Sequence, residues 1–377
     1  MAPAHPGVGG ARCRNAVTKR VHLARNDATS DANKRGVALT TPRALDNRVR
    51  SHPDASHRPR HSRSCPQRRA IRHDMANQLA RSQQQTCLHL LLEGNSLRST
   101  ARLTGVHRTT IQHLVVRFGT ACRDLMDDAF RGLQLEHVEV DEMWTFVRKK
   151  QSRLTIRERE QCHDIGDVYL WTCLDLRTKL IPSHVVGKRS ADNARKLMND
   201  LQGRLDRPAP HQSDDHAFER GTYAAVVQLS TDGFAGYPEA VDLAFGPYVK
   251  FGTIIKDYRN ATMTYTPSEL VGTRRTSRRG EVPLWSICTS HVERHNLTVR
   301  TFMKRFARLS LGFSKKLENL QAAVAMFLAY YNFVWRTRYP DGHVRRGQLR
   351  PTAAMMAGVT DRLWDVPRLF DEAMMYA

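Results

Sequence analysis

Residues 138–144 read Val-Glu-Val-Asp-Glu-Met-Trp, and Thr-Phe-Val follows at positions 145–147. Apolar and polar residues alternate along this stretch, which predicts a β-strand. Val138 and Val140 then face one way, and Asp141 faces the other together with Glu139. Glu139 could support Asp141, but we expect it on a solvated face. A carboxylate in the middle of a central strand is costly to bury unless a cation, a hydrogen-bond network or a metal ion compensates its charge. The rest of the chain must therefore supply groups that compensate Asp141.

The composition points towards a polyanionic partner. The chain has 377 residues and a net charge of +22, shared about equally between residues 1–74 and the remainder. Such an excess favours nucleic acid, although a highly soluble protein would show it too. The sequence has no run of eighteen apolar residues and no apolar signal core, so we expect no membrane partner and a cytoplasmic, nucleoid-associated location. Seven scattered cysteines without CxxC spacing argue against a disulfide framework and a zinc ribbon.

The N-terminal part divides into two regions. Residues 1–74 are rich in Arg, His, Pro and Ser without apolar periodicity, which predicts a disordered basic extension. The change of composition at Met75 suggests that translation naturally starts there, and the alternative is a basic arm that holds DNA without sequence preference. Residues 75–130 have helical periodicity and form the next predicted domain.

A helix-turn-helix is predicted within residues 75–130. Ser96 is placed to cap a short helix over residues 97–104, Gly105 provides a turn, and a second helix starts near Val106. The expected DNA contacts lie near the start of that second helix, at Arg108, Thr109 and Gln112. An ordinary helical hairpin is the structural alternative, and the basic charge favours DNA binding.

The next part of the chain alternates strands and helices. Strands are predicted at 167–175, 180–186, 224–231 and 249–258. Helices are predicted at 191–205, capped by Ser190, at 236–244, and, as a long amphipathic helix, at 314–335. This order predicts an α/β fold. Residues 259–284 lose the pattern and are expected to form a solvated insertion, whose arginines would grip DNA phosphates: Arg274, Arg275, Arg278 and Arg279.

Two further acids can join Asp141. Asp232 follows the strand predicted at 224–231, although Asp-Gly is also a common turn dipeptide. Glu293 lies in a helix expected to begin at Thr289 or Ser290, with Arg300 and Lys304 along the same face. A solvated face with weak surface ion pairs is the alternative.

Together the three acids fit phosphodiester chemistry. Carboxylate oxygens are preferred ligands of Mg²⁺ and Mn²⁺, and two such ions serve both cleavage and strand transfer of DNA. Three carboxylates are a sufficient protein contribution to such a pair of ions. A zinc site at His291 and His295 is disfavoured, because the glutamate of the zinc-protease motif directly follows its first histidine.

Three motifs carry a family resemblance: Val138–Trp144, Leu-Ser-Thr-Asp-Gly-Phe-Ala-Gly-Tyr at 229–237, and Thr-Ser-His-Val-Glu-Arg-His-Asn-Leu-Thr-Val-Arg at 289–300. They resemble the acidic motifs of the transposases typified by insertion sequence 1. Phe-Ser-Lys-Lys-Leu-Glu-Asn at 313–319, Tyr-Asn-Phe at 331–333 and the tail at 356–364 resemble the same family. The 61-residue gap between Asp232 and Glu293 exceeds the spacing of many other acidic-triad transposases, and the 259–284 insertion would account for it.

The resemblance implies a ribonuclease-H-like mixed sheet with flanking helices over 131–310, preceded by the all-α helix-turn-helix domain and followed by a helical region at 311–377. It implies that Asp141, Asp232 and Glu293 bind two Mg²⁺ or Mn²⁺ ions, with Arg300 as a basic partner. The implied activity is DNA transposition on double-stranded element ends and target, by a homo-oligomer that binds terminal inverted repeats. A non-catalytic helix-turn-helix protein with a decayed triad is the alternative, and a nuclease that cuts without joining is a third hypothesis.

Overall fold

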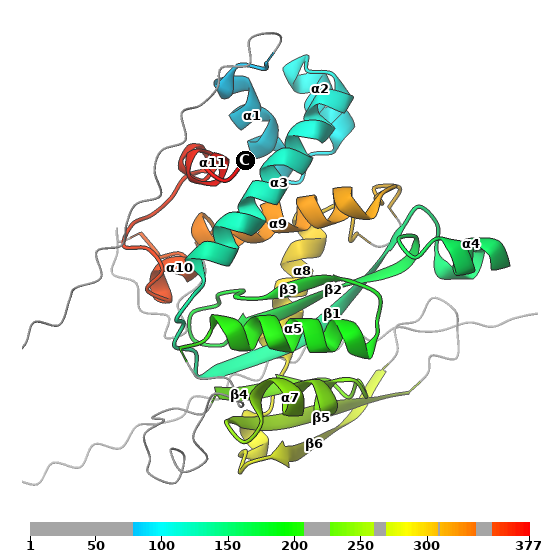
Figure 1. The fold of residues 1–377 in the computed structure, drawn as a ribbon, viewed down its shortest axis with the longest axis vertical. Coiled ribbons are helices and arrows are strands. Elements are labelled where there is room, and N and C mark those ends of the chain that lie inside the picture. The colour runs from blue at the N-terminus through cyan, green and yellow to red at the C-terminus, as the bar shows by residue number, and fades with distance from the viewer. Residues whose placement is uncertain (1–77, 207–226, 260–268, 308–309, 337–348) are drawn as a thin grey trace, which may run out of the picture. The chain divides into compact units, whose positions relative to one another are not determined.

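The computed structural model describes residues 78–206, 227–259, 269–307, 310–336 and 349–377. They all belong to one compact unit, His73–Ala377 (Figure 1). The predicted extension at 1–74, and residues 224–226 and 260–268 of two predicted segments, lie outside the described residues.

A six-stranded mixed sheet forms the centre of this unit, in the order β3-β2-β1-β4-β5-β6. β1, β2 and β3 are successive antiparallel neighbours, whereas β4 pairs parallel to β1 and β5 pairs parallel to β4. β6 closes the order as an antiparallel edge strand. The bounds are β1 His137–Val147, β2 Gly166–Asp175, β3 His184–Gly187, β4 Val227–Thr231, β5 Val249–Arg259 and β6 Glu269–Arg279. The predicted α/β class and mixed sheet are confirmed.

The central strands follow their sequence pattern. In β1, Val138 and Val140 are fully buried on one face, as their alternation predicts. β2 lies between β1 and β3 and is buried along most of its length, which explains its nearly continuous apolar sequence. β3 is shorter than the predicted strand at 180–186, because Leu180 to Ser183 lie outside its ladder.

The expectation of a solvated, patternless insertion at 259–284 is wrong for residues 269–279, which form β6. β6 pairs with β5 along nearly its whole length, from Phe251 opposite Arg279 to Arg259 opposite Glu269. An edge strand that is exposed on both faces needs no apolar alternation, so hydrophobic periodicity gave no signal here. The extra length between Asp232 and Glu293 therefore includes a strand of the sheet.

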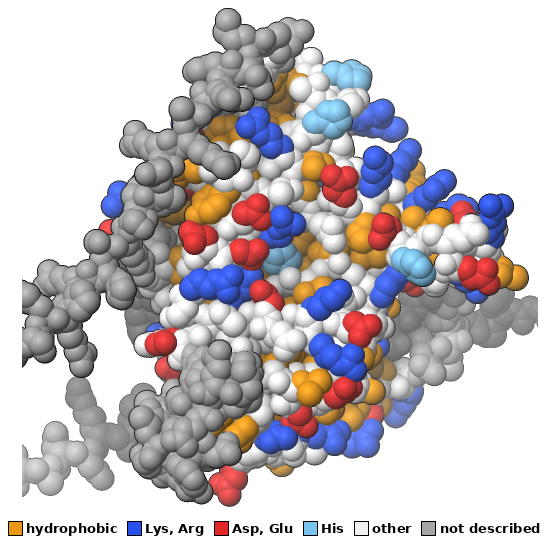
Figure 2. Space-filling view, in the orientation of Figure 1, with side chains coloured by type: hydrophobic (Ala, Val, Ile, Leu, Met, Phe, Trp, Pro, Cys, Tyr) orange, Lys and Arg blue, Asp and Glu red, His pale blue; other side chains and the backbone are white. Residues whose placement is uncertain are grey.

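Helices cover both faces of the sheet. α5 (Ala191–Arg204) and α7 (Tyr237–Phe245) pack side by side on one face, and α8 (Ser290–Phe302) packs against β1 and β2 on the other (Figure 1). The Ser190 side chain caps α5 by accepting from the Asn193 N–H, as predicted. Figure 2 shows basic and acidic side chains interspersed over the face that α5 covers.

A helical layer adjoins the sheet. It contains α1 (Arg81–Leu92), α2 (Leu97–Thr104), the 22-residue α3 (Arg108–Ala129), α9 (Leu317–Phe333), α10 (Ala353–Met356) and α11 (Val366–Met374). α3 and α9 lie in close backbone contact at Gly119, where a β-carbon would lie 2.1 Å from the Ala322 carbonyl oxygen. Glycine is therefore required at position 119 by the close contact of two helix backbones.

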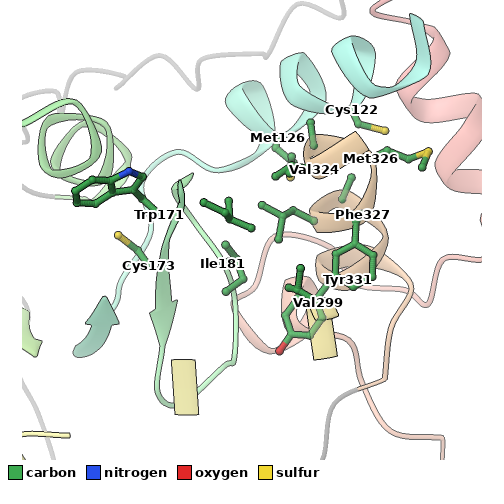
Figure 3. Close-up of a cluster of buried hydrophobic side chains, with 14 of the residues drawn as sticks. Cys122, Met126, Trp171, Cys173, Ile181, Val299, Val324, Met326, Phe327 and Tyr331 are labelled. Carbon is green, nitrogen blue, oxygen red and sulfur yellow. The ribbon is translucent and has the colours of Figure 1, made fainter. Parts of the chain in front are cut away.

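α9 is the centre of the hydrophobic core. We predicted an amphipathic helix over 314–335, but α9 is buried on all sides along most of its length. Figure 3 shows its Val324, Phe327 and Tyr331 side chains packed between α3 and Ile181. Asn332 also donates to and accepts from the backbone of Ile181, at 3.0 and 2.9 Å. This pairing satisfies a buried amide and links α9 to the chain before β3.

Short helices complete the described chain: η1 (Gln151–Arg153) and α4 (Ile156–Gln161) between β1 and β2, and η3 (Leu284–Ser286) before α8. Among the described residues, no helix is both long and apolar enough to span a bilayer.

Candidate functional site: an acidic cavity at the ends of parallel strands

Asp141 and Asp232 lie beside each other because of the strand register. β1 and β4 run parallel, and their last paired residues are Val140 and Thr231. Each acid is the next residue along its strand. The carboxyl ends of neighbouring parallel strands meet at one edge, so two acids that are 91 positions apart become neighbours.

Glu142 is a third carboxylate at this edge, and no sequence pattern predicted a role for it. Oxygens of Asp141, Glu142 and Asp232 lie within 4.8 Å of one another. β1 has no β4 partner beyond Val140, so the Glu142 side chain reaches this edge from the opposite face of the strand. Its side chain is only 2% exposed.

Arg189 compensates part of this negative charge. Its guanidinium lies 3.2 Å from Asp232 Oδ2 and 3.5 Å from Glu142 Oε1, and it stacks over the Phe234 ring at 4.6 Å. Arg189 directly precedes the Ser190 cap of α5, so the start of that helix fixes its position. In the sequence, Arg189 is distinguished only by its position before the predicted Ser190 cap. That position is too weak a signal to identify Arg189 as a residue of the site.

Burial and the mutual repulsion that Arg189 leaves uncompensated raise the pKa values of two of these carboxyl groups. Burial, and then the charge of Asp232, raises the pKa of Asp141 to about 7. The same two causes raise the pKa of Glu142 to about 8, against the opposing effect of Arg189. Carboxylates that repel one another in this way are well suited to a cation.

The face of β1 that carries Glu139 and Asp141 packs against α8. Glu139 is fully buried there, so the expectation that it lies on a solvated face is wrong. Its Oε2 accepts from the N–H groups of His291 and Val292, at 2.9 and 3.0 Å, and its Oε1 lies 2.8 Å from His291 Nδ1. Glu139 thus supplies the N-terminal cap of α8, where neither Thr289 nor Ser290 makes a side-chain cap bond.

α8 places two polar residues near the acids. Asn296 donates from Nδ2 to Asp141 Oδ2 at 2.7 Å, which orients that carboxylate. Glu293, one turn earlier, accepts from the Thr289 hydroxyl at 2.8 Å and pairs with Lys256 of β5. Arg189, before α5, and Lys256, on β5, therefore each pair with an acid of the site.

The three predicted acids line one cavity of about 460 Å³. Asp141, Asp232 and Glu293 share its wall with Arg189, Lys256, Thr289 and apolar residues of β5. The structure thus places on one cavity the three carboxylates that the motifs singled out, but Glu293 is not part of the 4.8 Å cluster that Asp141 and Asp232 form with Glu142. Arg300 lies two turns after Glu293 in α8, half-buried, and is not among the described residues that line the cavity.

The two histidines of α8 turn to different surroundings. His291 pairs with Glu139, whereas His295 is buried with its ring 4.5 Å from that of Tyr331. Burial lowers the pKa of His295 to about 3. The two imidazole rings therefore do not share one site.

The helix-turn-helix residues have the predicted local structure. Gly105 ends α2 in the left-handed region at φ 71°, and α3 begins at Arg108. Arg108 and Thr109 are exposed and Gln112 is half-buried. Arg108 and Gln112 line a groove that also contains Lys304, which lies just beyond the end of α8.

The four arginines expected in a phosphate-gripping loop lie instead on β6. Each contacts the protein: Arg274 pairs with Asp257, Arg275 donates to the Ile287 carbonyl, Arg278 donates to the Thr253 hydroxyl, and Arg279 pairs with Asp242. Successive residues of a strand alternate between faces, so this set does not form one basic surface.

The fold and the site together define an α/β protein with an acidic cavity at the carboxyl ends of its central parallel strands. The family model of the IS1 transposase matches residues 274–334. This match confirms the resemblance to an IS1-family DDE transposase and supports a transposase role. The matched segment contains Glu293 but neither Asp141 nor Asp232. No curated protein matches the chain.

Proposed function

We propose that the chain is a DNA transposase that cleaves element ends and joins them to target DNA by two-metal-ion chemistry. The observation that carries the proposal is the convergence of Asp141, Asp232 and Glu293 on one cavity. These residues come from β1, the end of β4 and α8. Three elements that are distant in sequence therefore bring them to one cavity when the chain folds. The sheet order, with β1 between antiparallel β2 and parallel β4, is compatible with the ribonuclease-H-like core expected for this chemistry.

The donor set fits Mg²⁺ or Mn²⁺. The oxygens of Asp141, Glu142 and Asp232 that cluster within 4.8 Å are all carboxylate oxygens, and the pKa of Asp141 is raised to about 7 by burial and by Asp232. Such hard, mutually repelling donors suit a divalent cation, which would displace the protons that they hold near neutral pH. We assign Asp141, Asp232 and Glu293 as the ligands of two ions, with Glu142 beside them. When bound, such ions activate water or a 3′-hydroxyl and neutralise charge on the reacting phosphate.

The protein's own residues orient and balance this site. Asn296 fixes one oxygen of Asp141, and Glu139 fixes the start of the helix that carries Asn296 and Glu293. Arg189 and Lys256 border the cavity as cations, so a DNA phosphate that enters it meets positive charges beside the carboxylates. We assign Arg300, two turns beyond Glu293, as a further basic residue of the DNA path.

The α2–turn–α3 unit supplies DNA recognition in this proposal. Gly105 and the exposed start of α3 support a helix-turn-helix that binds terminal inverted repeats through Arg108, Thr109 and Gln112. Lys304 and the β6 arginines are proposed to contact the backbone of the element or target duplex. The joining of two element ends implies a homo-oligomer on DNA.

The test replaces Asp141 by Asn and assays a duplex that carries the element end with Mg²⁺ or Mn²⁺. Cleavage and strand transfer are expected to disappear while end binding persists. Asp192→Asn, a 77% exposed acid on α5, is the matched control and should retain activity. If Asp141→Asn still cleaves, the assignment of the acids is wrong. A wild-type protein that binds ends but never cleaves would favour the non-catalytic alternative.

A second substrate separates transposition from simple cleavage. Pre-cut ends with a free 3′-hydroxyl bypass the first step, so wild-type protein should join them to a target plasmid. A protein that cleaves intact ends but never joins pre-cut ends would be a nuclease.

A further inference from the structure

A long groove lies between the helix-turn-helix elements and the connection from α8 to α9. Its volume is about 840 Å³, within the range of ligand sites. One wall comes from α1, α2 and the start of α3, and the other from residues 302–305 and 310–315. α9 forms the floor. The groove is separate from the acidic cavity, since the two share no lining residue.

Every charged residue that lines the groove is basic. The five cations are Arg98, Arg108, Lys304, Arg305 and Lys315. Within the described part of the chain, none of them has a carboxylate partner. This contrasts with Arg189 and Lys256, which pair with acids at the other site. The excess of positive charge therefore calls for an anionic ligand.

Arg305 strengthens this argument. Its guanidinium is mostly buried and donates to the Ser314 hydroxyl, and no described residue supplies it with a carboxylate partner. Burial lowers the pKa of Arg305 to about 10. A buried guanidinium without a counter-ion is costly, and a phosphate would compensate it. The Gln112 side-chain N–H₂ group is likewise buried without a partner among the described residues.

The floor and walls are apolar and partly aromatic. Phe302, Phe313 and Phe327 line the groove with aliphatic residues, and Leu311 is 95% exposed at its edge. A DNA duplex presents phosphates and sugars outwards and offers no flat apolar surface to such a floor. Unpaired bases do offer one, and cations combined with apolar side chains are typical of single-strand binding sites.

We propose that this groove binds unpaired nucleotides of a DNA strand, with phosphates on Arg98, Arg305 and Lys315, the groove cations that the proposed function leaves unassigned, and at least one base against the apolar floor. The inference rests on the proposed function only for the source of that strand, an element end opened near the cut. The groove joins the helix-turn-helix to the segment that follows α8, so a strand bound in it leads from the recognition unit towards the helix of Glu293.

The test measures equilibrium binding of a fluorescent single-stranded oligonucleotide to the full chain in EDTA, beside the same sequence as a blunt duplex. Lys315→Glu is the test variant. Lys316→Glu is the matched control, because Lys316 is also exposed but is not among the described groove residues. Loss of one phosphate contact reduces the salt slope by about 0.7, or affinity by about fivefold near 0.1 M salt. We expect at least that loss for Lys315→Glu, and a smaller one for Lys316→Glu.

The apolar contact is tested separately. A 2-aminopurine base in the strand should change its fluorescence on binding, and Leu311→Asp should reduce that change. Equal losses for both lysine variants, or unchanged single-strand binding by Lys315→Glu, would overturn the proposal. If Leu311→Asp instead converts a dimer to a monomer and leaves oligonucleotide binding intact, the groove binds a second copy. Because no cleavage is measured, failure here is distinguishable from failure of the proposed function, which Asp141→Asn addresses.

Discussion

Glu139→Ala should destabilise the protein far more than its position outside the acidic cavity suggests. The carboxylate accepts from two first-turn N–H groups of α8, at 2.9 and 3.0 Å, and lies 2.8 Å from His291 Nδ1. Hydrogen bonds to a charged group contribute about 1.5–3 kcal/mol each. Relief from burying the carboxylate offsets part of that sum, so we expect a loss of about 3–4 kcal/mol in the free energy of unfolding.

Glu139→Gln provides an internal comparison. The amide oxygen can still accept from the N–H groups of His291 and Val292, but the charge is lost, so the expected cost is only about 1–2 kcal/mol. Glu136→Ala is the matched control on the same stretch of chain, because Glu136 is exposed. A surface substitution of that kind should stay within about 0.5 kcal/mol.

Urea unfolding, followed by circular dichroism and tryptophan fluorescence, measures all three variants. The variant Glu139→Gln should also keep more cleavage activity than Glu139→Ala, since Asn296 and Glu293 depend on the start of α8. The reasoning fails if Glu139→Ala unfolds at the same urea concentration as Glu136→Ala. It also fails if the Ala and Gln variants are equally stable.

Three further outcomes are expected. Arg189→Gln removes a cation that competes with metal ions for the carboxylates. The Mn²⁺ affinity measured by calorimetry should therefore rise by about fivefold, which corresponds to the free energy of a partly exposed ion pair. Cleavage should fall. The raised pKa of Asp141 means that its contribution to stability without metal is fully present below pH about 4 and is lost as the pH rises through about 7. Urea unfolding of Asp141→Asn in EDTA should show a smaller loss of stability between pH about 4 and about 7 than wild type, with the part due to Glu142 retained, and the Mn²⁺ affinity of wild type should rise with pH. Gly119→Ala places a methyl group against the Ala322 carbonyl and should cost about 1–3 kcal/mol in urea unfolding, whereas Gly203→Ala has open space and should not destabilise.

The sequence predicted the parts of the fold that local periodicity and capping control. β1, β2, β4 and β5 lie where alternation or apolar runs placed them, and Ser190 caps α5. β6 was missed because an exposed edge strand carries no hydrophobic signal; its ladder to β5 determines it. α9 was misread as amphipathic because a sequence shows which residues are apolar, but not how many sides of a helix other elements cover.

The same distinction applies to the candidate site. Residue type and motif order were enough to select Asp141, Asp232 and Glu293, and the parallel register of β1 and β4 explains why the first two meet. Period-2 alternation also placed Glu139 correctly on the face of Asp141. Alternation could not show that α8 covers this face, so Glu139 was expected in solvent. Arg189 and Lys256 act only through tertiary contacts, which no local pattern reports.

These contacts explain how so acidic a site can fold before any metal binds. Three carboxylate groups within 4.8 Å would repel one another if all were ionised. Arg189 lies between Asp232 and Glu142, Asn296 donates to Asp141, and Lys256 pairs with Glu293 at the other wall. Protons on the carboxyl groups with raised pKa values relieve the rest. Metal binding would then exchange protons and side-chain cations for divalent ions, leaving Arg189 and Lys256 beside the cavity as free positive charges for the phosphate of a DNA strand.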